Sequence, residues 1–116
     1  MRCVAILRTG AGFPSQAAEE TQLTSSIRQY DDALTKAGVL LAAEQLHFGP
    51  IEAIVRCSGE LRVVLDGDFP KGVESIAAFW LWQVRSKEEA VEWARRFPNP
   101  PDAETVMEIR TVPGKR

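Results

Sequence analysis

The chain has few of the residues that build metal centres and disulfide frameworks. Its 116 residues include one histidine, His47, and two cysteines, Cys3 and Cys57, which lie in separate apolar runs. One histidine with two distant cysteines offers no ligand spacing of the zinc type, so we expect no metal site. Reduced thiols in apolar strands behave as small hydrophobic side chains, so no disulfide is expected and a cytoplasmic location is favoured.

Long apolar runs and clusters of positive charge are also missing. No run approaches the roughly 20 apolar residues of a membrane helix, and the stretch after Met1 is interrupted too soon for a signal peptide, so we expect no membrane association. Lysine and arginine are scattered along a chain of net charge −2, which argues against nucleic-acid binding. Gly10-Ala11-Gly12 lacks the third glycine of a dinucleotide loop and no nucleophile elbow occurs, so no cofactor is expected.

What remains is the composition of an ordinary globular domain. Hydrophobic residues make up 45% of the chain and charged residues 26%, the usual balance for a protein that folds around one core. No repeat or long linker divides the sequence, so we expect a single domain over residues 1–116.

Hydrophobic periodicity predicts an alternation of strands and helices. After Ser15, apolar residues recur at helical spacing until Gly38 stops the helix; they are Leu23, Ile27, Tyr30, Leu34 and Ala37. Asp31, Asp32 and Lys36 fall between them and are expected to face water. A second helix follows the capping box of Ser86 and Glu89. Strands are predicted at residues 3–7, 39–46, 51–57, 60–66, 75–84 and 106–112.

This order is typical of a ferredoxin-like α+β fold with an extra hairpin, in which two helices cover one face of an antiparallel sheet. The strand at 75–84 is apolar on both faces, with Ile76, Ala78, Trp80, Trp82 and Val84 predicted on one face and Ala77, Phe79 and Leu81 on the other. Its uncovered face therefore needs a partner. We expect a second copy of the chain to cover it, with Trp80 and Trp82 at the dimer interface or lining a pocket. The alternative is a monomer with an open ligand cleft on that face.

His47 and Asp66 are the candidate catalytic residues. A two-residue turn at 58–59 would pair Ile51 with Asp66 and bring this carboxylate near the chain that leaves His47. An imidazole titrates near neutral pH, and a neighbouring carboxylate would fix its tautomer and stabilise its charged form, as a general acid/base pair requires. The alternative is a surface histidine at a turn and an aspartate that caps the loop. Arg8, at the end of the first strand, is the candidate for holding a substrate carboxylate, although strand arginines are also common at solvated edges.

Several segments together resemble one known family. They are Gly38-Val39-Leu40-Leu41-Ala42, Glu44-x-Leu46-His47, Asp66-Gly67-x-Phe69, Phe79-Trp80-Leu81-Trp82-Gln83-Val84 and Phe97-Pro98-Asn99-Pro100. This pattern is similar to the YCII-related family, also called the DGPF-domain family, from the first strand to the last. The resemblance implies a dimeric α+β barrel of ferredoxin-like subunits with His47 and Asp66 as the site positions. Asp68 stands where the motif has proline, and Lys71 where it has an acidic residue, while Glu74 keeps a second acidic position.

Two functions from different classes remain open. The resemblance implies a small-molecule acid/base enzyme, similar to small isomerases and lyases, with His47 and Asp66 as its site. We expect such an enzyme to act on a small organic acid or an enolisable carbonyl compound. The altered loop at 68–71 favours instead a catalytically silent homodimer that binds a small organic ligand or a regulatory protein. The sequence does not decide between the enzyme and the binding module.

Overall fold

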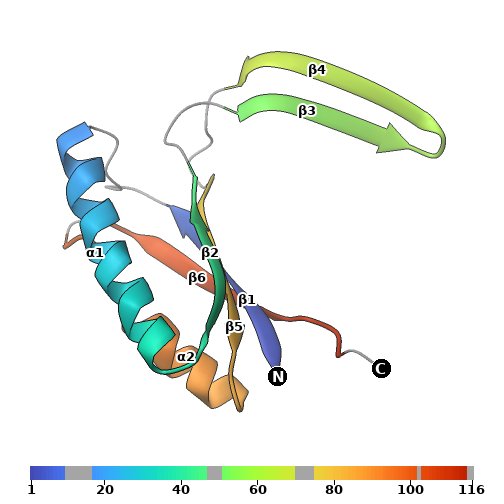
Figure 1. Cartoon of the computed structure of the whole chain (residues 1–116). Coiled ribbons are helices and arrows are strands. Elements are labelled where there is room, and N and C mark those ends of the chain that lie inside the picture. The colour runs from blue at the N-terminus through green and yellow to red at the C-terminus, as the bar shows by residue number, and fades with distance from the viewer. Residues whose placement is uncertain (10–16, 47–50, 70–74, 102, 115–116) are drawn as a thin grey trace.

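The computed structural model describes residues 1–9, 17–46, 51–69, 75–101 and 103–114, which form two sheets and two helices (Figure 1). The main antiparallel sheet has the strand order β2-β5-β1-β6 and consists of β1 (Arg2–Thr9), β2 (Leu40–Gln45), β5 (Ser75–Gln83) and β6 (Thr105–Thr111). The other elements are the helices α1 (Ala17–Lys36) and α2 (Lys87–Arg95) and a separate hairpin of β3 (Ile51–Ser58) and β4 (Leu61–Phe69). Without the hairpin the order is strand, helix, strand, strand, helix, strand, which confirms the predicted ferredoxin-like α+β fold.

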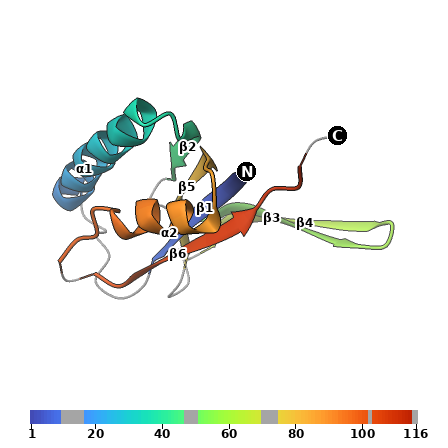
Figure 2. The same ribbon diagram turned by 90° about the horizontal axis from the view of Figure 1, so that it is seen from below.

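Both helices pack on one face of the main sheet and enclose the core (Figure 2). Side chains alternate along β1, so every second one points into this core; Cys3, Ala5 and Leu7 are 0% exposed. The apolar stripe of α1 is buried against them at Leu23, Ile27, Tyr30 and Leu34. Ala37, the last predicted residue of the stripe, is exposed because it lies beyond the end of α1. Among the residues that the structure describes, no helix is long and apolar enough to cross a membrane.

The ends of the helices follow the predicted stop and start signals. Gly38 ends α1 at a φ of 74°, a left-handed conformation that glycine adopts without the steric penalty of a side chain. At the start of α2, the Ser86 Oγ accepts a hydrogen bond from the backbone N–H of Glu89 at 3.2 Å. The Glu89 carboxylate in turn accepts from the backbone N–H of Arg85 at 2.6 Å, which is the main reason why the pKa of Glu89 is lowered.

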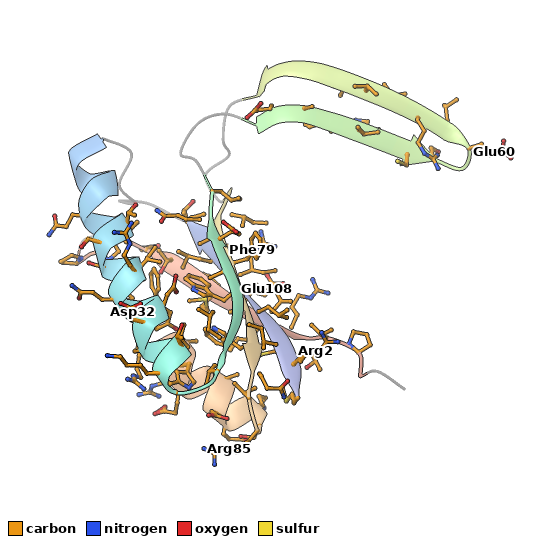
Figure 3. All side chains as sticks on the ribbon, in the orientation of Figure 1. Arg2, Asp32, Glu60, Phe79, Arg85 and Glu108 are labelled. Carbon is orange, nitrogen blue, oxygen red and sulfur yellow. The ribbon has the colours of Figure 1, made fainter. Side chains whose placement is uncertain are left out.

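A bulge in β5 determines which of its side chains reach the core. Trp80 and Trp82 lie on the helix-covered face, with 1% and 0% of their surface exposed, whereas Phe79 lies on the uncovered face and is 36% exposed (Figure 3). The pairing of β5 with β1 shifts register near Ile76, and a bulge of this kind reverses the face of the side chains beyond it. The prediction that Ile76 shares the face of Trp80 was therefore wrong, and Ile76 is 40% exposed.

The turn of the β3–β4 hairpin lies one residue further along the chain than predicted. Ser58 pairs with Leu61, so the turn residues are Gly59 and Glu60. Gly59 has a φ of 57°, and glycine at the first central position is the preference of a type II′ hairpin turn. The predicted turn was wrong because it placed this glycine at the second central position, and the error moved the expected cross-strand partners by two residues.

The hairpin projects away from the main sheet and forms a sheet of its own (Figures 1 and 2). Its two strands pair with each other from Ile51 and Phe69 to the turn, and Glu60 marks its far tip (Figure 3). Because β3 and β4 have no other strand partner in the described chain, both faces of the hairpin are largely uncovered within one subunit.

Candidate functional site

The structure describes only part of the predicted catalytic pair. His47 lies outside the described residues, and Asp66 is described through its backbone alone. That backbone pairs with Ala53 rather than with Ile51. The predicted partner of Asp66 was wrong because the hairpin turn lies one residue further along the chain than expected. Asp66 therefore pairs two residues further from Ile51, the start of β3, than the sequence suggested. The acid/base pair itself stays a prediction.

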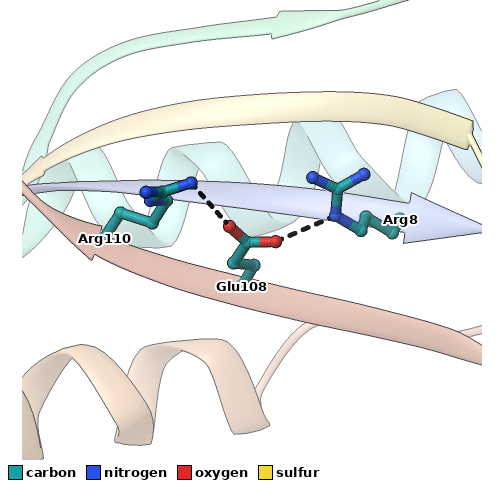
Figure 4. Close-up of polar contacts among 3 residues, drawn as sticks. All are labelled: Arg8, Glu108 and Arg110. Carbon is teal, nitrogen blue, oxygen red and sulfur yellow. Dashed lines mark hydrogen bonds and ion pairs between the residues drawn. The ribbon is translucent and has the colours of Figure 1, made fainter.

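Arg8 lies in a row of charged side chains on the uncovered face of the main sheet. Its Nε donates to Glu108 Oε1 at 2.9 Å, and Arg110 Nη1 donates to Glu108 Oε2 at 3.3 Å (Figure 4). These contacts, that from Arg8 foremost, lower the pKa of Glu108. The terminal nitrogens of Arg8 make no further hydrogen bond within the described chain, and its role in holding a substrate carboxylate stays a prediction.

Trp80 and Trp82 pack next to each other beneath the helices. Their ring centroids lie 6.4 Å apart, and Tyr30 and Phe97 contact Trp80 edge-on at 5.8 and 5.9 Å. Within one subunit both indoles therefore belong to the core, and Phe79 of the same strand faces the uncovered side. Trp80 also lines a pocket, but this pocket lies on the helix-covered side of the sheet, whereas the sequence pattern predicted the pair on the uncovered face.

That pocket is small, it has both polar and apolar residues in its lining, and it opens between α1 and β2. Its volume is about 180 Å³, and β2 is an edge strand of the main sheet. Its polar lining comes from both elements, and Trp80 of β5 forms part of its wall; the polar residues are Thr24, Arg28 and Asp31 of α1 with Glu44 and Gln45 of β2.

Asp31 is the half-buried titratable group of the pocket. Its Oδ1 accepts a 2.7 Å hydrogen bond from Trp80 Nε1. Burial raises the pKa of Asp31, the hydrogen bond from Trp80 opposes this rise, and the charge of Asp32 adds to it. The prediction that Asp31 faces water was wrong because a donor 49 residues further along the chain holds its carboxylate, and helical periodicity cannot reveal such a partner.

Of the other four polar residues that line the pocket, two are hydrogen-bonded to each other and two are exposed. Gln45 Nε2 donates to Thr24 Oγ1 at 3.2 Å, which connects β2 to α1. Arg28 and Glu44 are exposed, and neither is ion-paired with any residue that the structure describes. Sequence reasoning missed this site, although Thr24, Arg28 and Asp31 recur at helical spacing beside the apolar stripe, a signal that could have indicated a shared polar face.

The thiols and carboxylates suggest no other chemical centre. Cys3 is buried and Cys57 is exposed, and both are free thiols. Burial raises the pKa of Cys3, which keeps it protonated and a poor nucleophile. Within the described parts of the chain, no three histidine, cysteine, aspartate or glutamate side chains are grouped closely enough to hold a metal ion.

The strand order and the placement of both helices on one face define an α+β domain of the ferredoxin-like class. The family model of the YCII-related domain matches residues 3–113. The chain therefore belongs to the YCII-related domain family, which confirms the resemblance seen in its motifs. No curated protein matches the chain. The family match includes the positions of His47 and Asp66, but it assigns no reaction and no catalytic residue to them.

Proposed function

We propose that the chain is a homodimeric acid/base enzyme that acts on a small organic acid or an enolisable carbonyl compound, in the manner of an isomerase or lyase. His47 transfers the proton, and Asp66 orients its imidazole ring. The chain contains one histidine, and imidazole is the side-chain type whose unperturbed pKa lies closest to neutral pH. The family match over both positions supports this choice of residues.

The observation that carries the homodimer is the exposed apolar surface of the β3–β4 hairpin. Leu61 is 66% exposed, Val64 60% and Val55 54%, although these are side chains that normally become buried. A hairpin of two strands is at best marginally stable in water when nothing packs against it. A second subunit that covers the hairpin would supply the missing contacts.

The total surface of the chain supports the same proposal. The chain exposes 8122 Å², whereas a compact monomer of 12.9 kDa exposes about 6,300 Å². Its radius of gyration is 16.0 Å, against about 13 Å for a compact domain of this length. The excess of about 1,800 Å² is more than the ~800 Å² that each partner buries in a standard stable interface.

Dimerisation and the acid/base site are connected through the hairpin. Asp66 lies in β4, and no strand other than β3 pairs with β4 in the described part of the chain. A proton-transfer site works best where water is excluded, and one subunit does not enclose the hairpin. The second subunit would therefore complete the walls around Asp66.

The experiment that tests the enzyme is a turnover screen with small 2-oxo and 3-oxo acids, followed by proton exchange at their α-carbon in D₂O. We expect His47→Ala to abolish turnover and Asp66→Asn to reduce it, while both variants keep the molecular mass of the dimer. Loss of the general base typically costs about 10²- to 10⁴-fold in rate. Unchanged turnover in His47→Ala would remove this residue from the mechanism.

The second candidate function is a catalytically silent dimer that binds a metabolite or a regulatory protein. The pocket between α1 and β2 favours it, because this pocket offers charged groups without a described nucleophile or imidazole. The replacement of the motif's proline by Asp68 and of an acidic residue by Lys71 also favours it. Ligand binding without turnover by the native protein would decide for this function.

We also propose a cytoplasmic location. Cys57 is an exposed free thiol, and exposed thiols persist where glutathione and thioredoxin keep them reduced. The expected result is that the protein fractionates with cytoplasmic markers and that Cys3 and Cys57 are both reduced when thiols are trapped with maleimide under denaturing conditions.

A further inference from the structure

The pocket between α1 and β2 presents a carboxylate with one oxygen available to a ligand. Asp31 Oδ1 is occupied by the indole N–H of Trp80 at 2.7 Å, which fixes the orientation of the carboxylate. The other oxygen, Oδ2, makes no hydrogen bond within the described chain. A free carboxylate oxygen suits a ligand with N–H donors and a positive charge.

The same pocket also presents donors for a negative charge. Thr24 Oγ1 accepts from Gln45, so the hydroxyl hydrogen of Thr24 is free to point to another acceptor. Arg28 lies one turn further along α1, on the same side of the helix, and its guanidinium is not ion-paired with any described residue. A hydroxyl and a guanidinium side by side are suited to a carboxylate.

The two sets of groups are arranged along one helix. Thr24, Arg28 and Asp31 follow each other at spacings of four and three residues, which places them on one side of α1 along the pocket. The donors, Thr24 and Arg28, therefore lie toward the N-terminal end of this row on α1, and the carboxylate of Asp31 lies at its C-terminal end. Arg28 and Asp31 are close enough in sequence to form an ion pair, but they do not pair with each other. Both charges thus remain available for a ligand that carries opposite charges at its two ends.

We propose that this pocket binds a small α-amino acid, with its ammonium group on Asp31 and its carboxylate on Arg28 and Thr24. The indole of Trp80 forms the apolar wall beside the side chain of the ligand. This assignment uses neither the His47 nor the Asp66 side chain and does not depend on acid/base chemistry.

The size of the pocket limits the ligand to the smaller amino acids. Its volume is about 180 Å³. This is room for the ammonium, the α-carbon, the carboxylate and a short side chain. Pockets for drug-sized ligands are larger, at about 300–1,000 Å³. Glycine, alanine and serine are therefore the expected ligands, and aromatic amino acids are not.

The experiment is isothermal titration of the full-length protein with glycine, alanine and serine, with the fluorescence of the tryptophans as a second readout because Trp80 lines the pocket. A ligand of so few atoms in an open pocket is expected to bind with a Kd of about 1 mM. N-acetylglycine, which lacks the ammonium charge, and ethanolamine, which lacks the carboxylate, should each bind at least about tenfold more weakly.

Three variants connect the binding to the residues named. Asp31→Asn and Arg28→Gln should each weaken the binding of alanine at least about tenfold, the loss of one charge-assisted contact. Asp32→Asn removes the same charge from the next residue of the helix, which does not line the pocket, and should leave the Kd unchanged. Near-UV circular dichroism shows whether each variant keeps the packing of its tryptophans.

Two results would overturn the assignment. One is the absence of binding by all three amino acids at about 10 mM, ten times the expected Kd. The other is equal binding of alanine and N-acetylglycine, which would mean that Asp31 does not recognise an ammonium group. A failed turnover screen leaves this titration unaffected, since the titration measures binding and its variants retain His47 and Asp66.

Discussion

At the residue scale, the two tryptophans of β5 differ in what their indole N–H groups contact. Trp80 and Trp82 are 1% and 0% exposed, so both are fully buried. Trp80 Nε1 donates to Asp31 at 2.7 Å, whereas Trp82 Nε1 is buried and has no hydrogen-bond partner among the described residues. Two side chains of equal size and burial therefore differ mainly in one hydrogen bond.

This difference leads to a prediction for the variants Trp80→Phe and Trp82→Phe. Both replacements remove the same volume from the core, so their cavity costs are similar. Trp80→Phe also removes the donor to a half-buried carboxylate, and we expect it to lower the free energy of unfolding by about 1.5 kcal/mol more than Trp82→Phe. Urea denaturation of the two variants measures the difference. A larger loss for Trp82→Phe would contradict the role of the hydrogen bond.

Asp31 leads to a second prediction, which concerns pH. Its pKa is raised in the folded protein, chiefly by burial, so the folded state binds a proton more tightly than the unfolded state. The stabilisation is present below the usual carboxyl pKa of about 4 and is lost as the pH rises through the raised pKa of Asp31. Asp31→Asn keeps an oxygen for Trp80 but cannot ionise. We therefore expect the variant to unfold at higher urea concentration than the native protein at pH 7 and at an equal concentration near pH 3. A less stable variant at pH 7 would show that the charged form is favoured in the fold.

At the element scale, the capping contact of α2 leads to a third prediction. Ser86 Oγ accepts the N–H of Glu89, one of the groups that would otherwise lack a partner at the start of the helix. Ser86→Ala should therefore cost about 1 kcal/mol of unfolding free energy, while Ser86→Asp, which keeps an acceptor, should cost little. Thermal unfolding compares the two variants with the native protein. Equal losses in both would mean that the hydroxyl does not cap the helix.

The sequence was sufficient for the elements whose signals are local. The stripe of α1, its stop at Gly38 and the cap at Ser86 all depend on residues within a few positions of each other, and the structure confirms them. Two errors arose where a single residue changes the geometry of a strand. The bulge in β5 reverses the face of Ile76, and the conformation of Gly59 changes the register of the hairpin.

The pocket could not be predicted in the same way, because it depends on contacts between distant elements. Asp31 and Trp80 are joined across 49 residues, and Gln45 and Thr24 across 21 residues. Periodicity assigns a residue to a face of its own helix or strand, but it does not state which element covers that face. The strand order of the sheet, which brings β2 and β5 beneath α1, was needed to bring these residues together.

At the scale of the whole molecule, one part of the chain buries its apolar side chains and another part exposes them. The main sheet and its helices enclose a core with fully buried tryptophans. The uncovered face of that sheet and the hairpin have large apolar side chains in contact with water, including Phe79, Val64 and Leu61. This division is expected of a subunit whose second core forms on association.

The hairpin leads to the last prediction, which concerns the oligomeric state. Val64 is 60% exposed in one subunit, and its replacement by aspartate would place a charge in the proposed interface. In a two-fold dimer each substitution occurs twice, so the loss of two buried valines, at about 1.5 kcal/mol each, raises the dissociation constant at least about a hundredfold. We expect Val64→Asp to sediment as a monomer at micromolar concentration, while the near-UV circular dichroism of Trp80 and Trp82 persists.

Glu60→Gln, at the hairpin tip, is the control and should remain a dimer. If Val64→Asp sediments like the native dimer, the hairpin lies outside the interface, and if the native protein sediments as a monomer, the homodimer itself is disproved.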